Sequence, residues 1–227
     1  MSALFEFRDL FGGYGDTQIL SGISGKVDAG DILGVFGRNG VGKSTLGRLL
    51  YGELCATSGQ ITHAGRDVTA QKAFARRKSG IGYMPQTRMV FDDLTVRENL
   101  SLSSNKADID LYFDRFPRLA ERLDQPAGTM SGGERKILAF VRAMIEDTTL
   151  VILDEPSEGV QPENIENMAT ILCERAAGGV GILLIEQNIN FLMRTATQLM
   201  GIDAGRIVLE GPKASLSIGE VKDVLSV

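Results

Sequence analysis

The chain has 227 residues, a mass of 24.5 kDa, a formal net charge of −5 and a pI of about 5.1. This length suits one large α/β domain, or one domain with an inserted subdomain, and argues against a second full domain. The acidic balance argues against a protein that holds nucleic acid through its phosphates, because such binding needs a clustered excess of Lys and Arg. The basic run ARRK at residues 75–78 is short, and we expect it to form a solvated helix face.

The sequence also bears on the compartment of the protein. No apolar run approaches the ~18 residues that a membrane-spanning helix needs, and the start MSALFEFRDL lacks the basic and apolar regions of a signal peptide. We therefore expect a cytoplasmic protein that reaches a membrane through partners. Cys55 and Cys173 have neither metal-ligand nor disulfide-framework spacing, and we expect both to be buried thiols in a reducing compartment.

The first part of the chain predicts strands on either side of one helix. ALFEFRDL at 3–10 alternates as a strand does, and GGYGDTQIL at 12–20 predicts a turn into a second strand of a small antiparallel sheet. GDILGVFG at 30–37 predicts a buried strand that ends at a loop, with a helix after it. SGQITHAGRDVT at 58–69 predicts two short strands around a turn, with His63 as a surface or turn residue. GIGYMPQ at 80–86 predicts a buried strand that Pro85 ends.

Helical apolar spacing then replaces the strand pattern from residue 91 to about 146, with Ser131 as an N-cap. This change predicts an inserted helical subdomain at 88–146, between two parts of a core at 1–87 and 147–227. The alternation of strands and helices then returns. We expect strands at 149–156, 179–187 and on both sides of an Asp-Ala-Gly turn at 203–205, and helices at 162–177 and 188–199.

The stretch GRNGVGKST matches G-x-x-x-x-G-K-S/T and stands between a buried strand and a helix, which is the context of a P-loop. Backbone amides of residues 40–43 would cradle phosphates, Lys43 would neutralise β and γ oxygens, and Ser44 would bind Mg²⁺. The sequence therefore predicts a nucleoside triphosphate site made by Gly37, Arg38, Asn39, Gly40, Val41, Gly42, Lys43, Ser44 and Thr45.

Two adjacent carboxylates follow the apolar stretch LVIL at 150–153. A parallel sheet would set Asp154 beside the P-loop, where it would hold Mg²⁺ through water. Glu155 would reach past the metal and deprotonate the water that attacks the γ-phosphate. Adjacent carboxylates at a strand end can be mere surface charge, but their place in a P-loop protein favours the functional interpretation.

A second motif gives a competing signal. NKAD at 105–108 matches the N-K-x-D pattern that reads guanine in GTPases. It follows polar SLSS rather than a buried strand, and Asp154 begins DEPS rather than a D-x-x-G. We therefore predict that NKAD forms a helix-capping turn.

TMSGGERKI at 129–137 places a second glycine pair at a helix start, although one nucleotide does not need two phosphate loops from one chain. The P-loop, Gln86 after a strand, MSGGERK and LVILDEP, in that order, resemble the ATP-binding cassette (ABC) ATPases over residues of about 4–212. The resemblance implies an α/β fold with a RecA-like core, an antiparallel β subdomain and a helical subdomain, and ATP with Mg²⁺ as cofactors. It also implies a site on a second, facing ATPase subunit, completed by Ser131, Gly132 and Gly133 with the dipole of the helix that follows.

The same resemblance implies further roles. Tyr14 would stack on adenine, although a Tyr beside glycines can equally be a packing residue. Gln86 would contact Mg²⁺ and the γ-phosphate while its loop contacts a transmembrane partner, and SEGV at 157–160 would cross the dimer interface.

The resemblance has one departure. Most ABC ATPases have a histidine after the strand that reads ILLIEQN here, and Gln187 takes this position. A glutamine amide can donate to a γ-phosphate oxygen and accept from water, but it carries no proton charge. We therefore expect retained, slower hydrolysis with Glu155, Lys43 and Gln187 as the catalytic residues.

GYMPQTRMVFDDLTVRENL, DEPSEGVQPENIE and LLIEQN together look like the ATPase subunit of branched-chain amino acid and urea/amide uptake transporters. This implies two ATPases on two dissimilar permeases, fed by a periplasmic binding protein, at the cytoplasmic side of the membrane and without nucleic acid. ATP would close the ATPase dimer, and the motion would drive permease helices docked near residues 86–100.

Two alternatives remain. The first is an ABC ATPase of DNA repair or translation. Such proteins usually have a long coiled-coil insertion or two fused cassettes, this sequence shows neither, and its acidic balance also argues against this role. The other is a regulatory subunit with little hydrolysis, against which the Asp154–Glu155 pair argues.

Overall fold

The computed structural model describes residues 3–87, 89–103 and 109–226. In this part of the chain, strands form a four-stranded antiparallel sheet of order β2-β1-β4-β5 and a six-stranded mixed sheet of order β10-β9-β3-β8-β7-β6. The antiparallel sheet is the one expected from the start of the sequence. Its strands are β1 (Phe5–Tyr14), β2 (Thr17–Val27), β4 (Ser58–His63) and β5 (Arg66–Asp67).

The mixed sheet positions the predicted site. Its strands are parallel except for β10, which pairs antiparallel with β9 at one edge. Because parallel strands end at the same edge of a sheet, the loops after β3, β6, β7 and β8 meet there. The strands are β3 (Ile32–Phe36), β6 (Ile81–Met84), β7 (Leu150–Asp154), β8 (Gly181–Ile185), β9 (Gln198–Asp203) and β10 (Arg206–Pro212).

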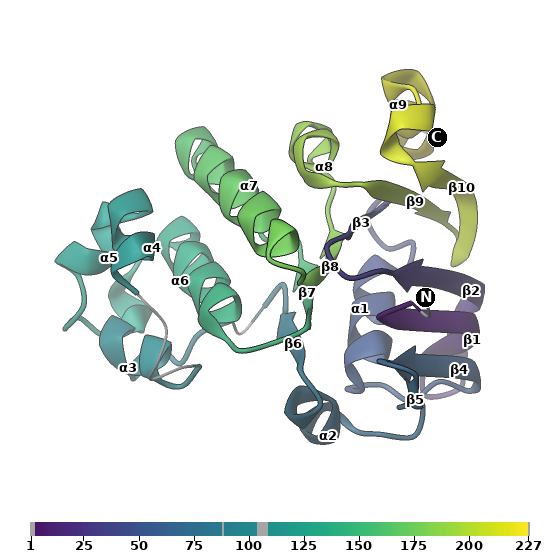
Figure 1. Cartoon of the computed structure of the whole chain (residues 1–227), viewed down its shortest axis with the longest axis horizontal. Coiled ribbons are helices and arrows are strands. Elements are labelled where there is room, and N and C mark those ends of the chain that lie inside the picture. Colours follow the sequence, from purple (N-terminus) through teal and green to yellow (C-terminus); the bar gives the residue numbers. More distant parts are fainter. Residues whose placement is uncertain (1–2, 88, 104–108, 227) are drawn as a thin grey trace.

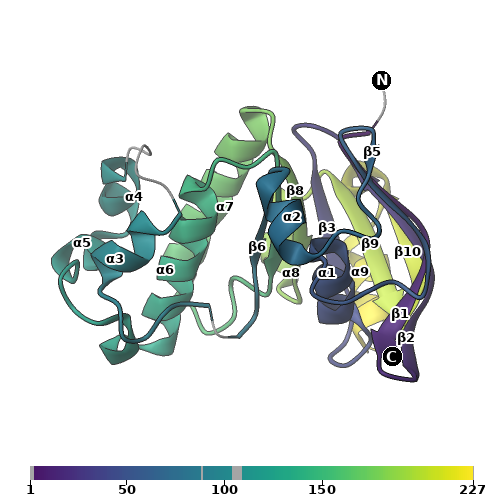
Figure 2. The same cartoon turned by 90° about the horizontal axis from the view of Figure 1, so that it is seen from below.

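Both faces of the mixed sheet are covered, so its central strands are buried at every position and read as continuous apolar runs. On one face, helix α1 (Lys43–Tyr51) and the antiparallel sheet bury a core that includes Leu33 and Leu183. On the other face, helices α6 to α9 bury a second core that includes Ile32 and Ile182. Figure 1 and Figure 2 show α1 and α7 on opposite sides of the sheet.

Helices fill the chain between β6 and β7, as their apolar spacing predicts. Thr95 caps α3 and Ser131 caps α6, each with a Glu three residues on that completes a capping box. Figure 1 shows α3, α4 and α5 at the end of the molecule opposite the antiparallel sheet. These elements are α3 (Val96–Ser101), α4 (Asp110–Arg115), α5 (Pro117–Glu121), the 3₁₀ turn Ala127–Thr129 and α6 (Gly132–Ile145).

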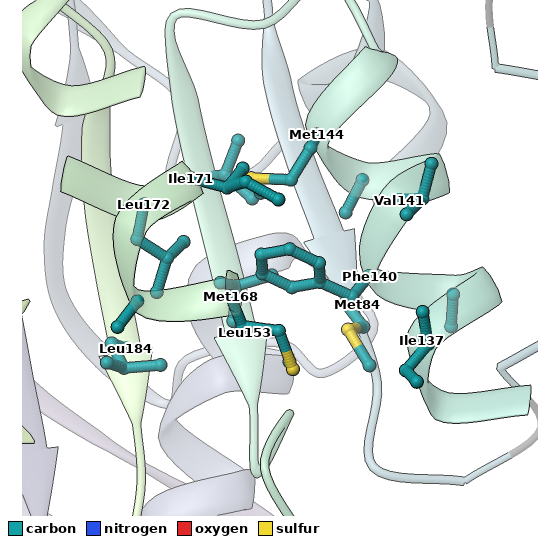
Figure 3. Packing of buried hydrophobic residues seen from close by; sticks show 14 of the residues in the cluster. Met84, Ile137, Phe140, Val141, Met144, Leu153, Met168, Ile171, Leu172 and Leu184 are labelled. Carbon is teal, nitrogen blue, oxygen red and sulfur yellow. The ribbon is translucent and has the colours of Figure 1, made fainter. Parts of the chain in front are cut away.

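Helix α6 joins this segment to the rest of the chain. In Figure 3 the ring of Phe140 lies between α6, β7 and α7 (Pro162–Ala177), with Leu153 and Met168 beside it. The remaining elements are α8 (Ile189–Thr195), the 3₁₀ turn Lys213–Ser215 and α9 (Ile218–Ser226). Among the described residues, no helix combines the length and the apolar character that a membrane crossing requires.

The expectation for ARRK is wrong at Arg76. The run lies in helix α2 (Ala73–Lys78), where Arg77 and Lys78 are exposed, but Arg76 is 1% exposed. Its guanidinium donates hydrogen bonds of 2.7–3.2 Å to four main-chain carbonyl oxygens, two of them at the last turn of α1. A planar group with five donors suits such a cluster of helix-end and loop carbonyls.

Two further expectations are corrected. His63 is buried rather than on the surface, because it shares the inward face of β4 with Ile61, and its Nε2 lies 2.9 Å from the Thr149 hydroxyl. Cys55 and Cys173 are exposed rather than buried. The NKAD motif lies outside the described residues.

Candidate functional site

The loop between β3 and α1 has the shape that a phosphate chain needs. Gly40 has φ of 82°, and an added Cβ would meet no atom within 4 Å, so the backbone faces open space there. Helix α1 begins at Lys43, directly after Gly42 with φ of 110°. The Lys43 Nζ donates to the carbonyl oxygens of Gly37 and Arg38 at 2.9 Å each, and burial lowers the pKa of this lysine. Backbone amides, a helix N-terminus and one cation therefore surround this space.

Ser44 and Asp154 come together as predicted. The Ser44 hydroxyl donates to Asp154 Oδ1 at 3.1 Å, which joins the first turn of α1 to the last residue of β7. Asp154 is 1% exposed, and burial raises its pKa to about 6 against the opposing effects of Ser44 and Lys43. A hydroxyl and a carboxylate are hard oxygen ligands, which Mg²⁺ takes together with phosphate oxygens. The donor set therefore fits a magnesium ion, and no cluster of three His, Cys, Asp or Glu among the described residues offers another site.

The Glu155 carboxylate is the point where the loops converge. Gln86 Nε2, from the loop after β6, donates to Oε2 at 2.6 Å, and Gln187 Nε2, from the loop after β8, donates to Oε1 at 2.7 Å. Lys43 Nζ lies 3.7 Å from Oε1. Gln187 also donates to the Asn39 side chain in the P-loop. The structure thus places Gln86 on Glu155 rather than on the Ser44–Asp154 pair.

Ser131 and the two glycines after it lie at the N-terminus of α6. The Ser131 hydroxyl accepts from the main-chain N–H of Glu134 at 3.3 Å. An added Cβ on Gly133 would stand 2.8 Å from the carbonyl oxygen of Gly159, so this helix start packs closely on the loop after β7. Within the described residues, no hydrogen bond joins residues 131–133 to the P-loop. Their action on a facing chain stays a prediction.

Tyr14 ends β1 and is 44% exposed. Arg48 Nη1, on α1, donates to its hydroxyl at 3.3 Å. This places the phenol ring next to the helix that follows the P-loop, and its contact with adenine stays a prediction.

The family assignment follows from a comparison with protein-family models. The model described as "ABC transporter" matches residues 20–158, more than half of the chain. The chain belongs to this family. The ABC fold expected from the motifs is confirmed. The expected ATPase activity is confirmed as well, because ATP-binding domains of this family hydrolyse ATP.

Several relatives match this ABC ATPase over most of their length. It is 38% identical over 210 residues to the "High-affinity branched-chain amino acid transport ATP-binding protein BraG" of Pseudomonas aeruginosa, covering 89% of this chain and 90% of that one. It is 35% identical over 207 residues to the "Probable branched-chain amino acid transport ATP-binding protein LivF" of Archaeoglobus fulgidus, covering 88% of each.

Solved structures agree with this assignment. An ATP-binding subunit of an ABC transporter has a TM-score of 0.84 at 26% identity and covers 99% of this chain and 100% of its own. A nucleotide-free ATP-binding cassette from an ABC transporter has a TM-score of 0.81 at 26% identity and covers 100% of this chain and 96% of its own.

The ABC ATPase has one buried carboxylate that the sequence analysis missed. Glu186 is 2% exposed, and burial raises its pKa. One oxygen accepts from the main-chain N–H of Ser157 at 2.8 Å, and the other accepts from those of Gln187 and Asn188 at 2.9 and 3.1 Å. Glu186 therefore ties the loop after β7 to the loop after β8. A charged residue directly after the apolar run ILLI was the signal that could have found it.

Proposed function

We propose that this ABC ATPase drives the uptake of branched-chain amino acids by hydrolysing Mg²⁺·ATP in a closed pair of cassettes. The observation that carries the hydrolytic site is the Glu155 carboxylate, held by two glutamine amides beside Lys43. The two relatives described above are named for branched-chain amino acid transport, which supports this solute class.

Different groups of the site have different roles in hydrolysis. The P-loop amides and Lys43 bind the β and γ phosphate oxygens, while Ser44 and Asp154 hold the metal. When bound, Mg²⁺ supplies positive charge to the phosphate oxygens that gain negative charge in the reaction. Glu155 accepts the proton of the attacking water.

Two amides set the direction of the base. The Gln187 amide donates to both Glu155 and Asn39 of the P-loop. It can therefore contact a γ-phosphate in the P-loop while it holds the Glu155 carboxylate. Gln86 donates to the second Glu155 oxygen, which leaves the carboxylate little rotational freedom.

A second cassette completes the site. We propose that Ser131, Gly132 and Gly133 cap the γ-phosphate bound to a facing subunit, where the N-terminus of the 14-residue helix α6 adds a favourable dipole. Tyr14 stacks on adenine at the other end of the nucleotide. Binding of ATP closes the pair, and hydrolysis reopens it.

The permease docks beside the Gln86 loop. A groove of about 170 Å³ lies next to this loop and is lined in part by Pro85, Met89 and Arg142. Phe91 borders it and is 55% exposed, with the Arg142 guanidinium 5.3 Å from its ring centroid. An exposed aromatic ring under a cation suits a short amphipathic helix of a transmembrane subunit. Movement of that helix would shift Gln86 and, through its hydrogen bond, the Glu155 carboxylate.

The transport proposal is tested by affinity purification from the host membrane. The tagged chain is recovered from gently solubilised membranes, and its partners are identified by mass spectrometry. Two dissimilar permeases, a second P-loop ATPase and a periplasmic binding protein are expected. Branched-chain amino acids bound by that binding protein would support the solute class, and urea or short amides would replace it. Recovery with ribosomes or DNA-repair proteins would overturn the transport role.

The role of Glu155 is tested separately with Glu155→Gln. We expect kcat to fall roughly 10²- to 10⁴-fold, which is the usual contribution of a general base, while ATP binding persists. Glu163 is exposed in the first turn of α7, so Glu163→Gln is the matched control and should hydrolyse normally. Hydrolysis by Glu155→Gln at the wild-type rate would remove Glu155 from the mechanism.

A further inference from the structure

Lys136 is a buried cation next to the proposed base, and the hydrolytic mechanism above does not use it. It lies in α6, five residues after Ser131, and is 4% exposed. Its Nζ donates to the main-chain carbonyl oxygen of Glu155 at 2.9 Å. The nearest anion is the Glu158 carboxylate at 3.4 Å, whose side chain is 60% exposed.

Burial of this ammonium costs free energy that packing alone does not require. Lysine is almost never fully buried unless it is paired, and a partner in contact with water offsets the cost of burial weakly. A methionine would fill the same volume without that cost, as replacement of buried ion pairs by apolar residues shows. The ammonium therefore points to a task other than filling space.

The conformation of the Glu155 backbone suggests that this task is to hold the main chain in place. Glu155 has φ of 50°, a left-handed conformation that a residue with a Cβ rarely adopts. Its main-chain N–H donates to the carbonyl of Ile185 at 2.9 Å. Its main-chain carbonyl accepts from Lys136 Nζ at 2.9 Å and, over a longer 3.4 Å, from the main-chain N–H of Glu158. The two short hydrogen bonds hold the peptide groups on both sides of the strained Cα, and so determine where the carboxylate points.

We infer that Lys136 is a positioning residue for ATP hydrolysis, which acts by holding the main-chain carbonyl of Glu155. This inference rests on the proposed role of Glu155 as the base. Because Ser131 caps α6, the same helix presents the loop proposed for the facing ATP and the lysine that positions the base of its own site. The close contact of Gly133 with Gly159 joins the two segments at a second point.

The test measures kcat and the dissociation constant for ATP in the full-length chain. In Lys136→Met we expect kcat to fall roughly 10- to 100-fold, the usual effect of displacing a catalytic group, with ATP affinity within about twofold of wild type. Lys136→Gln keeps an N–H donor, so its kcat should lie at least about threefold above that of the Met variant and below wild type.

Lys213→Met is the matched control. Lys213 Nζ donates to the main-chain carbonyl of Met193 at 2.9 Å, so this variant loses the same kind of hydrogen bond away from the site. Its kcat should stay within about twofold of wild type, because no catalytic group moves.

The outcomes separate this inference from the proposed function. A wild-type kcat in Lys136→Met, or a loss that appears entirely as weaker ATP binding, would overturn the role of Lys136. If the Met variant does not fold, Lys136→Leu, which also lacks a donor, is measured in its place, and a wild-type kcat there overturns the role in the same way. Glu155→Gln is measured in the same series. Normal hydrolysis by Glu155→Gln refutes the base itself, whereas an inactive Glu155→Gln beside a normal Lys136→Met refutes only the positioning role.

Discussion

Asp154→Asn should stabilise the protein in the absence of nucleotide and magnesium. The Asp154 carboxylate is buried at the end of β7, and its pKa is raised from 3.8 to about 6. A difference of about 2 units corresponds to about 3 kcal/mol at 1.36 kcal/mol per unit. Asparagine keeps an oxygen that accepts from the Ser44 hydroxyl, and it removes the charge. At pH 7.5 the variant should therefore unfold with a free energy up to about 3 kcal/mol higher than wild type.

The raised pKa of Asp154 determines how the stability difference between variant and wild type depends on pH. Because the folded protein binds the Asp154 proton more tightly than the unfolded chain does, ionised Asp154 destabilises the fold fully above about pH 6. The destabilisation falls as the pH drops below 6 and disappears below about pH 4, where the carboxyl becomes protonated in the unfolded chain as well. At pH 5 about half of the difference between variant and wild type should remain.

Urea denaturation at pH 7.5 and pH 5, in buffer with a chelator, measures both values. Asp203 ends strand β9 of the same sheet and is exposed, so Asp203→Asn is the control and should change stability by less than about 0.5 kcal/mol. With Mg²⁺ and ATP added, wild type should become more stable than Asp154→Asn, because only wild type keeps the proposed metal ligand. A less stable Asn variant, or a difference independent of pH, would refute the argument.

Three further predictions concern other residues. Gln187→Ala removes the amide that orients the base, and it should lower kcat roughly 10- to 100-fold with little change in ATP affinity. Gln187→His should retain hydrolysis. A fully active Ala variant would exclude Gln187 from the mechanism. Arg76→Met removes one donor from each of four main-chain carbonyls, of which Leu49 and Val68 keep a main-chain donor. It should cost about 3–5 kcal/mol in urea denaturation, against less than about 1 kcal/mol for the exposed neighbour Arg77→Met. Equal losses would contradict the role of the buried hydrogen bonds. Gly133→Ala should destabilise the fold by about 1–3 kcal/mol, because the added Cβ would lie 2.8 Å from a carbonyl oxygen. Gly132→Ala adds a Cβ in open space, so it should leave stability unchanged or raise it by up to about 1 kcal/mol. Thermal melting of both variants, followed by circular dichroism, tests the difference.

Much of the fold and site follows from local pattern. The strands β3, β7 and β8 are apolar runs that end in glycine or a carboxylate, and this pattern predicts both their burial and the position of the loops after them. The P-loop and Asp154 are therefore found from the sequence, because parallel strands bring their ends together. The N-cap at Ser131 follows from the Ser-x-x-Glu pattern alone.

One wrong expectation, Arg76, and one residue that the sequence analysis did not single out, Lys136, have environments that depend on distant parts of the chain. Arg76 is buried because its side chain binds carbonyls of α1 and of the loop between β5 and α2, and the residues of ARRK themselves give no sign of these partners. Lys136 sits in an apolar helical run, but its partner is a main-chain oxygen 19 residues away. His63 is a different case, since the alternation of β4 places it on the same face as buried Ile61.

Asp154 ends β7 and Glu186 directly follows β8, and these two carboxylates also bear on how the mixed sheet folds. Both strands are apolar on both faces, so a slip of one residue would exchange the two cores with little change in buried hydrophobic area. Such a slip would instead draw Asp154 or Glu186 into the apolar interior, or pull it away from its hydrogen-bond partners, at a cost of several kcal/mol. The charged ends of these strands therefore act as stops that select one pairing. A variant with apolar residues at both positions would lose this selection along with its activity.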